Sequence, residues 1–169
     1  MKETELKLLS ELMKNSRRSD RELAKAIGAS QPTVSRTIKK LTEEGYIKEF
    51  TIIPDFKKLG YKLMALTLVK FKNQLAERQE IEGSLKKALS KIIMFEKGLG
   101  LGFDAAIISY HENYFSFSKF LEWLKYSASL EVSDVQTFLI SLDDKERYCP
   151  LSFQAIAAHL SMLKKKMRK

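Results

Sequence analysis

The segment from residue 19 to residue 45 has two short helical patterns separated by a glycine. Ser19 and Glu22 form a capping box, in which each side chain satisfies a free backbone amide at a helix start. Gly28 follows about two turns later, and glycine is the residue best suited to the left-handed conformation after a helix end. Ser30 then caps a second helix that has a proline in its first turn, where a missing amide costs little. This pattern predicts two helices joined by a tight turn.

The residues on either side of this segment complete a small helical unit. Leucines at helical spacing predict a first helix over residues 5–14. Residues 46–53 are rich in β-forming side chains and precede a proline, which predicts a strand. Ala24 and Val34 are the small and the branched residue expected where two helices cross and where the second helix enters the core. Residues 1–60 are therefore predicted to form a (winged) helix-turn-helix domain.

The helix that begins after Ser30 has two different faces. Val34, Ile38 and Leu41 form an apolar stripe that is expected to pack in a core. The opposite face carries no acidic residue before Glu43, and its side chains are of types that bind base edges and phosphates in a major groove. An ordinary solvated basic face is the alternative, but the turn, the caps and the stripe all favour DNA binding. The residues predicted to contact double-stranded DNA are Arg17, Arg18, Ser30, Gln31, Thr33, Ser35, Arg36, Thr37, Lys39 and Lys40.

The net charge of +9 is unevenly distributed along the chain. The first 60 residues and the last 20 are basic, whereas the residues between them are neutral. Uneven basicity suits binding to a polyanion, because each neutralised phosphate releases counterions; a role in solubility alone is the alternative. Arg17 and Arg18 precede the second helix, and for them backbone contact and plain solvation are equally compatible with the sequence.

From residue 61 onward, strand and helix patterns alternate. The predicted elements are strands at 61–71, 92–96, 103–110 and 135–142, and helices at 75–90 and 114–125. This β-α-β-β-α-β order is the ferredoxin-like arrangement, an antiparallel sheet with two helices on one face, so the fold class is α+β. Residues 63–69 and 105–108 are apolar on both faces, although two helices cover only one. We therefore predict that the second face packs against a partner, most simply the same sheet of a second subunit.

The last twenty residues contain a helical pattern with a lysine-rich end. The apolar stripe of this helix, which begins after Pro150, is expected to pack on a sheet edge or on a neighbouring subunit. Its basic end is expected to be a solvated tail, with phosphate contacts as the alternative. The predicted domains are a helix-turn-helix domain at 1–60, a ferredoxin-like domain at 61–145, and a C-terminal helix with a basic tail at 146–169.

The sequence offers few groups for catalysis or for metal binding. Its single cysteine, Cys149, excludes an internal disulfide and a multi-cysteine zinc site. The two histidines, His111 and His159, lie in no motif with paired carboxylates, a nucleophile elbow or a phosphate loop. We therefore expect no metal, no cofactor and no catalytic residue. The sequence also has no long apolar run and no signal-peptide pattern at its start, which predicts a cytoplasmic protein without a membrane partner.

Three segments resemble the Lrp/AsnC family of prokaryotic transcription regulators. They are SDRELAKAIGAS at 19–30, VSRTIKKLTEEGYI at 34–47, and DFKKLG at 55–60. The resemblance implies a sequence-specific DNA-binding regulator whose ferredoxin-like second domain (RAM) senses a small molecule such as an amino acid. It also implies that these domains pair sheet to sheet into dimers and often octamers. Some proteins that resemble the family decarboxylate tetrapyrroles, so a ligand-binding or enzymatic protein without DNA binding is the alternative function.

Two departures from the family pattern concern the sites. The family often has two consecutive arginines in its recognition helix, whereas here Arg36 is followed by Thr37, so a base preference does not transfer. Family members also have a glycine three residues before an aspartate in the hairpin between the middle strands, near the effector pocket. Here the glycines stand four and two residues before the aspartate, and a simple glycine turn is the alternative to an effector site. The effector-binding residues implied by the resemblance are Gly98, Gly100, Gly102 and Asp104.

Overall fold

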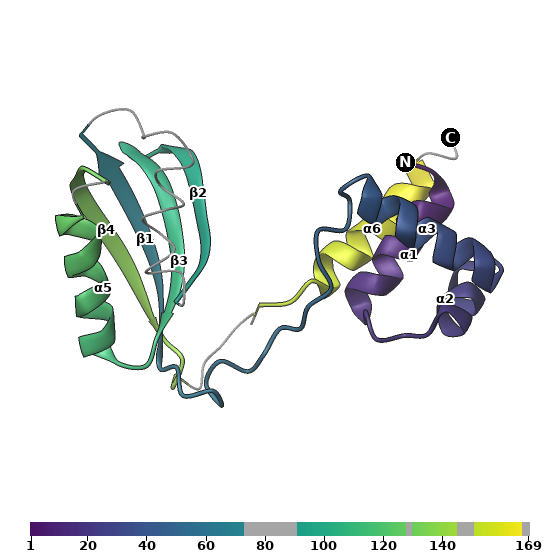
Figure 1. The fold of residues 1–169 in the computed structure, drawn as a ribbon, viewed down its shortest axis with the longest axis horizontal. Coiled ribbons are helices and arrows are strands. Elements are labelled where there is room, and N and C mark those ends of the chain that lie inside the picture. Colours follow the sequence, from purple (N-terminus) through teal and green to yellow (C-terminus); the bar gives the residue numbers. More distant parts are fainter. Residues whose placement is uncertain (73–90, 128–129, 145–150, 167–169) are drawn as a thin grey trace. The chain divides into compact units, whose positions relative to one another are not determined.

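The computed structural model contains two compact units (Figure 1), and its described residues are 1–72, 91–127, 130–144 and 151–166. The first unit comprises Met1–Ile53 and Tyr148–Lys169, and the second comprises Pro54–Arg147. The helix predicted over residues 75–90 lies outside the described residues, as do Pro150 and Cys149. Within the described residues, no helix is long and apolar enough to cross a membrane.

The first unit is helical in its described part. Its helices are α1 (Glu3–Lys14), α2 (Asp20–Ile27), α3 (Gln31–Glu43) and α6 (Gln154–Lys166). The capping box predicted at the start of α2 is confirmed, because the backbone amide of Glu22 donates to the Ser19 hydroxyl and the Glu22 carboxylate accepts from the Ser19 amide at 2.8 Å. The core of the unit consists of Leu8, Leu12, Leu23, Ala24, Ile27, Val34, Leu41 and Ile47.

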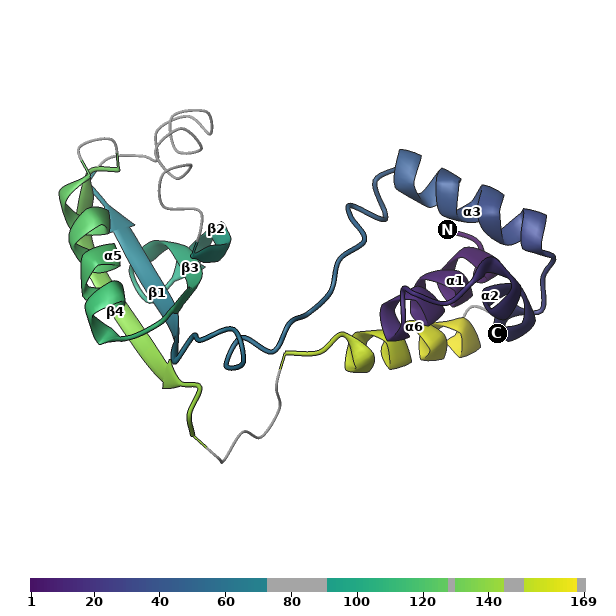
Figure 2. The same ribbon diagram turned by 60° about the horizontal axis from the view of Figure 1, so that its bottom comes forward.

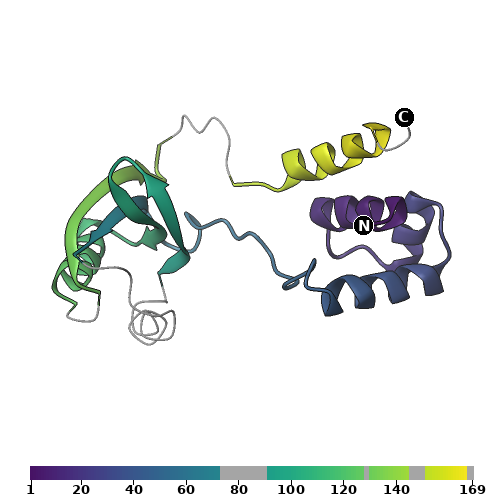
Figure 3. The same ribbon diagram turned by 90° about the horizontal axis from the view of Figure 1, so that it is seen from above.

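Helix α6 packs along α1, and α1 lies between α6 and α3 (Figures 2 and 3). The buried Ser10 hydroxyl donates to the carbonyl of Ala157 at 2.8 Å, and the Gln154 amide donates to the carbonyl of Lys14 at 3.0 Å. Small side chains at Ser10 and Ala157 allow the two helices to approach closely. Within the chain the helix therefore packs on α1 and not on a sheet edge, and its contact with a neighbouring subunit stays a prediction. An apolar stripe shows which face of a helix is buried but does not identify the element that buries it.

Residues 46–53 form no strand, so the strand predicted there is wrong. The segment begins at the end of α3, where the backbone amide of Ile47 donates to the carbonyl of Leu41 at 3.0 Å. Phe50 and Ile52 follow with exposed side chains. A strand exists only where another strand pairs with it, and β-propensity mostly measures how well a side chain fits a paired, half-buried surface. These residues have the right composition, but they pair with no strand in the described part of the chain.

The second unit is built on a four-stranded antiparallel sheet with the strand order β2-β3-β1-β4. Its strands are β1 (Leu63–Phe71), β2 (Ile92–Gly100), β3 (Phe103–His111) and β4 (Val132–Ser141), and helix α5 (Tyr114–Tyr126) follows β3. This order is the one expected of a ferredoxin-like fold, so the predicted α+β class is confirmed. The four predicted strands and the helix at 114–125 are confirmed as well, with ends shifted by a few residues.

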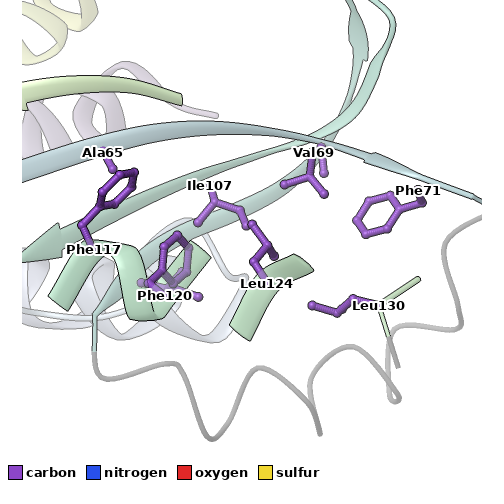
Figure 4. Close-up of a cluster of buried hydrophobic side chains, with 10 residues drawn as sticks. Ala65, Val69, Phe71, Ile107, Phe117, Phe120, Leu124 and Leu130 are labelled. Carbon is purple, nitrogen blue, oxygen red and sulfur yellow. The ribbon is translucent and has the colours of Figure 1, made fainter. Parts of the chain in front are cut away.

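Helix α5 covers one face of this sheet (Figure 1), and the main core of the unit lies between them. Figure 4 shows Phe120 and Leu124 of α5 pointing toward Val69 of β1 and Ile107 of β3. These strand residues alternate with residues on the opposite face. The side chains of α5 therefore bury only those strand residues that point to the α5 side of the sheet.

The other face of the sheet is apolar and is not covered by a described helix of this unit. In register across three strands, Leu66 lies beside Ile108 and Phe138, and 69% of Phe138 is exposed. One end of this face is closed by the segment before β1, where the ring of Phe56 stacks on that of Tyr110 with centroids 3.8 Å apart. We refer to Met64, Leu66, Leu68, Ile108, Phe138 and Ile140 as the open sheet face.

Candidate nucleic-acid interface

The turn between α2 and α3 is fixed by local geometry. Gly28 has the left-handed conformation, with φ of 70°, and this confirms its predicted place after the helix end. At the start of α3 the Ser30 hydroxyl accepts from the backbone amide of Thr33 at 3.4 Å and lies 2.8 Å from the Thr33 hydroxyl. Val34 and Leu41 are fully buried in the core of the unit. These contacts fix both the start of α3 and its rotation about its own axis.

The rotation of α3 determines which of its side chains face solvent. Gln31, Ser35, Arg36 and Lys39 are exposed. Arg36 makes no hydrogen bond or ion pair with any residue in the described ranges, so its guanidinium is available to a partner. Thr37 is half-buried, and its hydroxyl donates to the carbonyl of Thr33 at 2.7 Å.

Several of the predicted basic residues are instead engaged with acidic side chains of the same unit. The ammonium of Lys40 lies 2.7 Å from the carboxylate of Glu5 in α1. The guanidinium of Arg18 donates to the carboxylate of Glu11 and, at 3.2 Å, to the carbonyl of Glu22. Two longer ion pairs join α3 to the acidic residues at its end. Lys39 lies 3.8 Å from Glu43, and Lys40 lies 3.7 Å from Glu44.

Glu5 is the most deeply buried of these acidic partners, since only 5% of the residue is exposed. Its carboxylate accepts from the ammonium of Lys40 and from the backbone amide of Lys2. The hydrogen bond from Lys40 lowers the pKa of Glu5, and the same bond raises the pKa of Lys40. Sequence reasoning missed Glu5, because the two residues are 35 positions apart and nothing local pairs them.

The short connection between α1 and α2 carries the other two predicted contacts. Arg17 is exposed, and its backbone amide donates to the Asn15 side chain at 3.0 Å. Arg18 is half-buried against Glu11. The hydrogen bonds from Lys14 and then Arg18 lower the pKa of Glu11. The two consecutive arginines therefore differ, since Arg17 extends into solvent and Arg18 ties the connection to α1.

The residues predicted to bind an effector lie at the hairpin between β2 and β3. Gly102 has φ of 79°, a conformation that favours glycine, and it lies at the start of β3. Asp104 accepts a hydrogen bond from the backbone amide of Phe71 at 2.9 Å and so ties β3 to the end of β1. Gly98 and Gly100 lie in β2, and all three glycines are exposed. The hairpin thus holds the glycines together, and the carboxylate of Asp104 already has a backbone partner.

The histidines give no sign of a catalytic site. His111 is fully buried against α5; its Nε2 lies 2.8 Å from the Ser109 hydroxyl, and burial lowers its pKa to about 4. His159 is exposed on α6. In the part of the chain that the structure describes, no group of three His, Cys, Asp or Glu side chains is placed to hold a metal ion.

The chain is similar to known proteins that share this helix-turn-helix. A family model described as winged helix-turn-helix DNA-binding matches residues 1–48. An uncharacterized HTH-type transcriptional regulator of Pyrococcus abyssi is 31% identical over 120 residues, which are 71% of this chain and 79% of that protein. Another, from Pyrococcus furiosus, is 42% identical over 72 residues, which are 43% of this chain and 48% of that protein. The chain spans about half the length of the first curated relatives that it matches.

Solved structures with the same fold cover nearly the whole chain. LrpC of Bacillus subtilis superposes with a TM-score of 0.70 and 24% identity, over 87% of this chain and 99% of that one. A transcriptional regulator of Neisseria meningitidis, solved in complex with L-Met, superposes with a TM-score of 0.70 and 20% identity, over 92% of this chain and 99% of that one. At such identities the similarity concerns the fold.

The left-handed turn at Gly28 leads to a stability prediction. An added Cβ at this position would meet no atom within 4 Å, so a substitution tests the backbone conformation alone. Gly28→Ala should destabilise the first unit by about 1–2 kcal/mol, the cost of a left-handed conformation for an ordinary residue. Gly28→Asn should cost less, because asparagine tolerates this conformation better. Urea unfolding followed by circular dichroism measures both losses, and equal losses for the two variants would contradict the explanation.

Proposed function

Because the chain belongs to the Lrp/AsnC family of helix-turn-helix transcriptional regulators, we propose that it is a sequence-specific DNA-binding regulator that acts as a homodimer or higher oligomer. The observation that carries the proposal is the outer face of α3. It presents Gln31, Ser35 and Arg36 to solvent, with no acidic side chain before Glu43, on a helix whose orientation is fixed by its cap and its buried stripe. Such a function belongs in the cytoplasm of a prokaryotic cell. The relatives are named as transcriptional regulators, so an enzymatic alternative is not favoured.

In the proposed complex, α3 lies in the major groove of double-stranded DNA. The groove is wide enough for a helix, and a bidentate guanidinium is the side chain best suited to read guanine. Arg36 is exposed and makes no hydrogen bond or ion pair with a described residue, so we assign base reading to it first. Gln31 and Ser35, which are also exposed on α3, are assigned to the same groove. The remaining predicted contacts are Arg17, Arg18, Ser30, Thr33, Thr37, Lys39 and Lys40. We assign them to phosphates or to the groove edges, except Lys40, whose ammonium is held by Glu5.

We propose that the open sheet face forms the dimer interface. Monomeric proteins rarely expose a contiguous apolar patch of this kind, and the face is self-complementary in chemistry because every side chain at its centre is apolar. A second copy of the same face is therefore the simplest partner. A two-fold dimer presents two copies of α3, and in such dimers the half-sites lie about one helical turn apart, roughly 34–36 Å. The DNA site is then near-palindromic.

Arg36→Ala should weaken binding to a duplex selected from a random library by about 1–3 kcal/mol if Arg36 reads a base. The fold should remain intact, because the side chain is exposed. Arg36→Lys is the matched control, because it keeps the charge but lacks the bidentate guanidinium. Its affinity should therefore fall by most of the amount lost in Arg36→Ala. Gel-shift titrations measure both. Full binding by the lysine variant would assign Arg36 to a phosphate rather than to a base.

Phe138→Asp should dissociate the dimer. Phe138 is 69% exposed in one chain, so the change costs a monomer little, whereas in the proposed interface it buries an unpaired charge. We expect the dissociation constant to rise by about 100-fold or more, because an uncompensated buried charge costs several kcal/mol. Phe115→Asp is the matched control, since Phe115 is 70% exposed on α5, on the other side of the sheet. Sedimentation equilibrium distinguishes them, and an unchanged association of Phe138→Asp would refute this interface.

We further propose that a small molecule such as an amino acid binds the second unit near Gly98, Gly100, Gly102 and Asp104. The support is the L-Met bound in the Neisseria structure and the hairpin that gathers these residues here. We expect at least one of the common amino acids to raise the melting temperature in a thermal-shift screen at about 5–10 mM. The high concentration is used because stabilisation grows with the excess of ligand over its dissociation constant. Asp104→Asn should abolish that shift. A screen without any shift or change in oligomer size would leave a regulator that needs no ligand.

A further inference from the structure

Lys40 differs from the other basic residues of α3, because its side chain forms a close ion pair with a buried carboxylate. The ammonium of Lys40 lies 2.7 Å from the carboxylate of Glu5, which belongs to the first turns of α1. The side chain of Glu5 is only 7% exposed, whereas that of Lys40 is 46% exposed. The carboxylate of Glu5 is therefore buried at the contact between α1 and α3. Lys40 lies at the solvent-exposed edge of this contact, and its ammonium neutralises the carboxylate.

The second acidic neighbour of Lys40 provides an internal comparison. Glu44 directly follows α3; its carboxylate lies 3.7 Å from the ammonium of Lys40, and 46% of its side chain is exposed. An exposed pair at this distance contributes little and is screened by salt. A buried carboxylate that loses its cation, in contrast, is left uncompensated and must be rehydrated or moved. The structural consequence of removing Lys40 thus falls on Glu5 and on the contact between α1 and α3.

We propose that Lys40 is a positioning residue of the recognition helix rather than a phosphate contact, and that its ion pair with the buried Glu5 sets the angle of α3 on α1. This inference rests on the proposed DNA-binding function. Leu41, the next residue, is fully buried, so the ion pair lies at the edge of the apolar contact that holds this end of the helix. Arg36 lies one helical turn before Lys40 on the same side of α3. A tilt at Lys40 therefore moves the guanidinium that is proposed to read a base.

Because Glu5 is charged, the two explanations predict opposite changes in DNA affinity when it is replaced. Glu5→Gln removes a negative charge from the side of the unit that faces DNA, and electrostatics alone would then predict tighter binding to any duplex. The positioning role predicts the opposite for a specific site, because a ligand held slightly out of place loses much of its affinity. The two explanations therefore differ in direction and not only in size.

The experiment uses the full chain and two probes: a duplex that the wild-type protein selects from a random library, and an unselected random duplex. Glu5→Gln and Lys40→Gln should each weaken binding to the selected duplex by about tenfold, the lower end of the loss known for removing a partner that orients a binding residue. Binding of Glu5→Gln to the random duplex should stay as in the wild type or tighten, and the salt dependence of Lys40→Gln on the random duplex should stay as in the wild type. Glu44→Gln is the matched control, because it removes the exposed partner of the same lysine, and it should leave both affinities unchanged. Circular dichroism confirms that every variant is folded.

Two results would overturn the inference. In the first, Lys40→Gln weakens both duplexes alike and lowers the slope of log K against log salt by about 0.9, as expected for the loss of one phosphate contact. In the second, Glu5→Gln binds the selected duplex as tightly as the wild type or more tightly. The double variant gives a further check, since two residues that act through one pair should lose no more together than either loses alone.

A failure of the proposed function gives a different result from a failure of this inference. If the wild-type protein selects no duplex, DNA binding is refuted. The coupling between Glu5 and Lys40 is then read from thermal unfolding of the same four proteins: the wild type, the two single variants and the double variant. Losses that are smaller together than their sum support the coupling, and additive losses refute it.

Discussion

The burial of Val34 and Leu41 is the interaction on which the proposed function depends. These two side chains are fully buried in a core formed with residues of α1 and α2 and with Ile47, and together they fix the rotation of α3 about its axis. A helix that is held on one face presents the opposite face without any further contact, so Arg36 is exposed because Leu41 is not. The turn at Gly28 and the cap at Ser30 set where the helix begins. The apolar core therefore decides which polar residues are offered to DNA.

Helix α1 has a larger structural role than its sequence suggests. It lies between α3 and α6, and it contacts both by polar groups. On one side Glu5 accepts from Lys40, and on the other Ser10 donates to the carbonyl of Ala157. The chain thus returns after the second unit to complete the first one.

Features that depend on neighbouring residues could be predicted from the sequence, and features that depend on distant residues could not. The capping box at Ser19 and the left-handed Gly28 are determined within a few residues, and both are confirmed. The sheet order followed from the alternation of strands and helices, which is also a local pattern. The strand at 46–53 failed because a strand requires a partner that composition does not provide. The contact of Glu5 with Lys40 and the packing of α6 on α1 were missed for the same reason, since residues 35 and 147 positions apart carry no mutual signal.

The number of basic residues in the first unit overstates the number of cations that it offers to DNA. Lys40 and Arg18 are each paired with a carboxylate of α1, and Lys39 lies near Glu43. Each such pair neutralises a cation before any phosphate arrives, so it releases few counterions on binding. Of the three basic side chains of α3, only that of Arg36 makes no ion pair with a described residue. An interface of this kind gains less from nonspecific attraction and depends more on base contacts, on shape, and on having two copies of α3 in one assembly. The open sheet face is therefore as important to the proposed DNA binding as α3, because a weakly charged recognition helix needs the second copy that a dimer supplies.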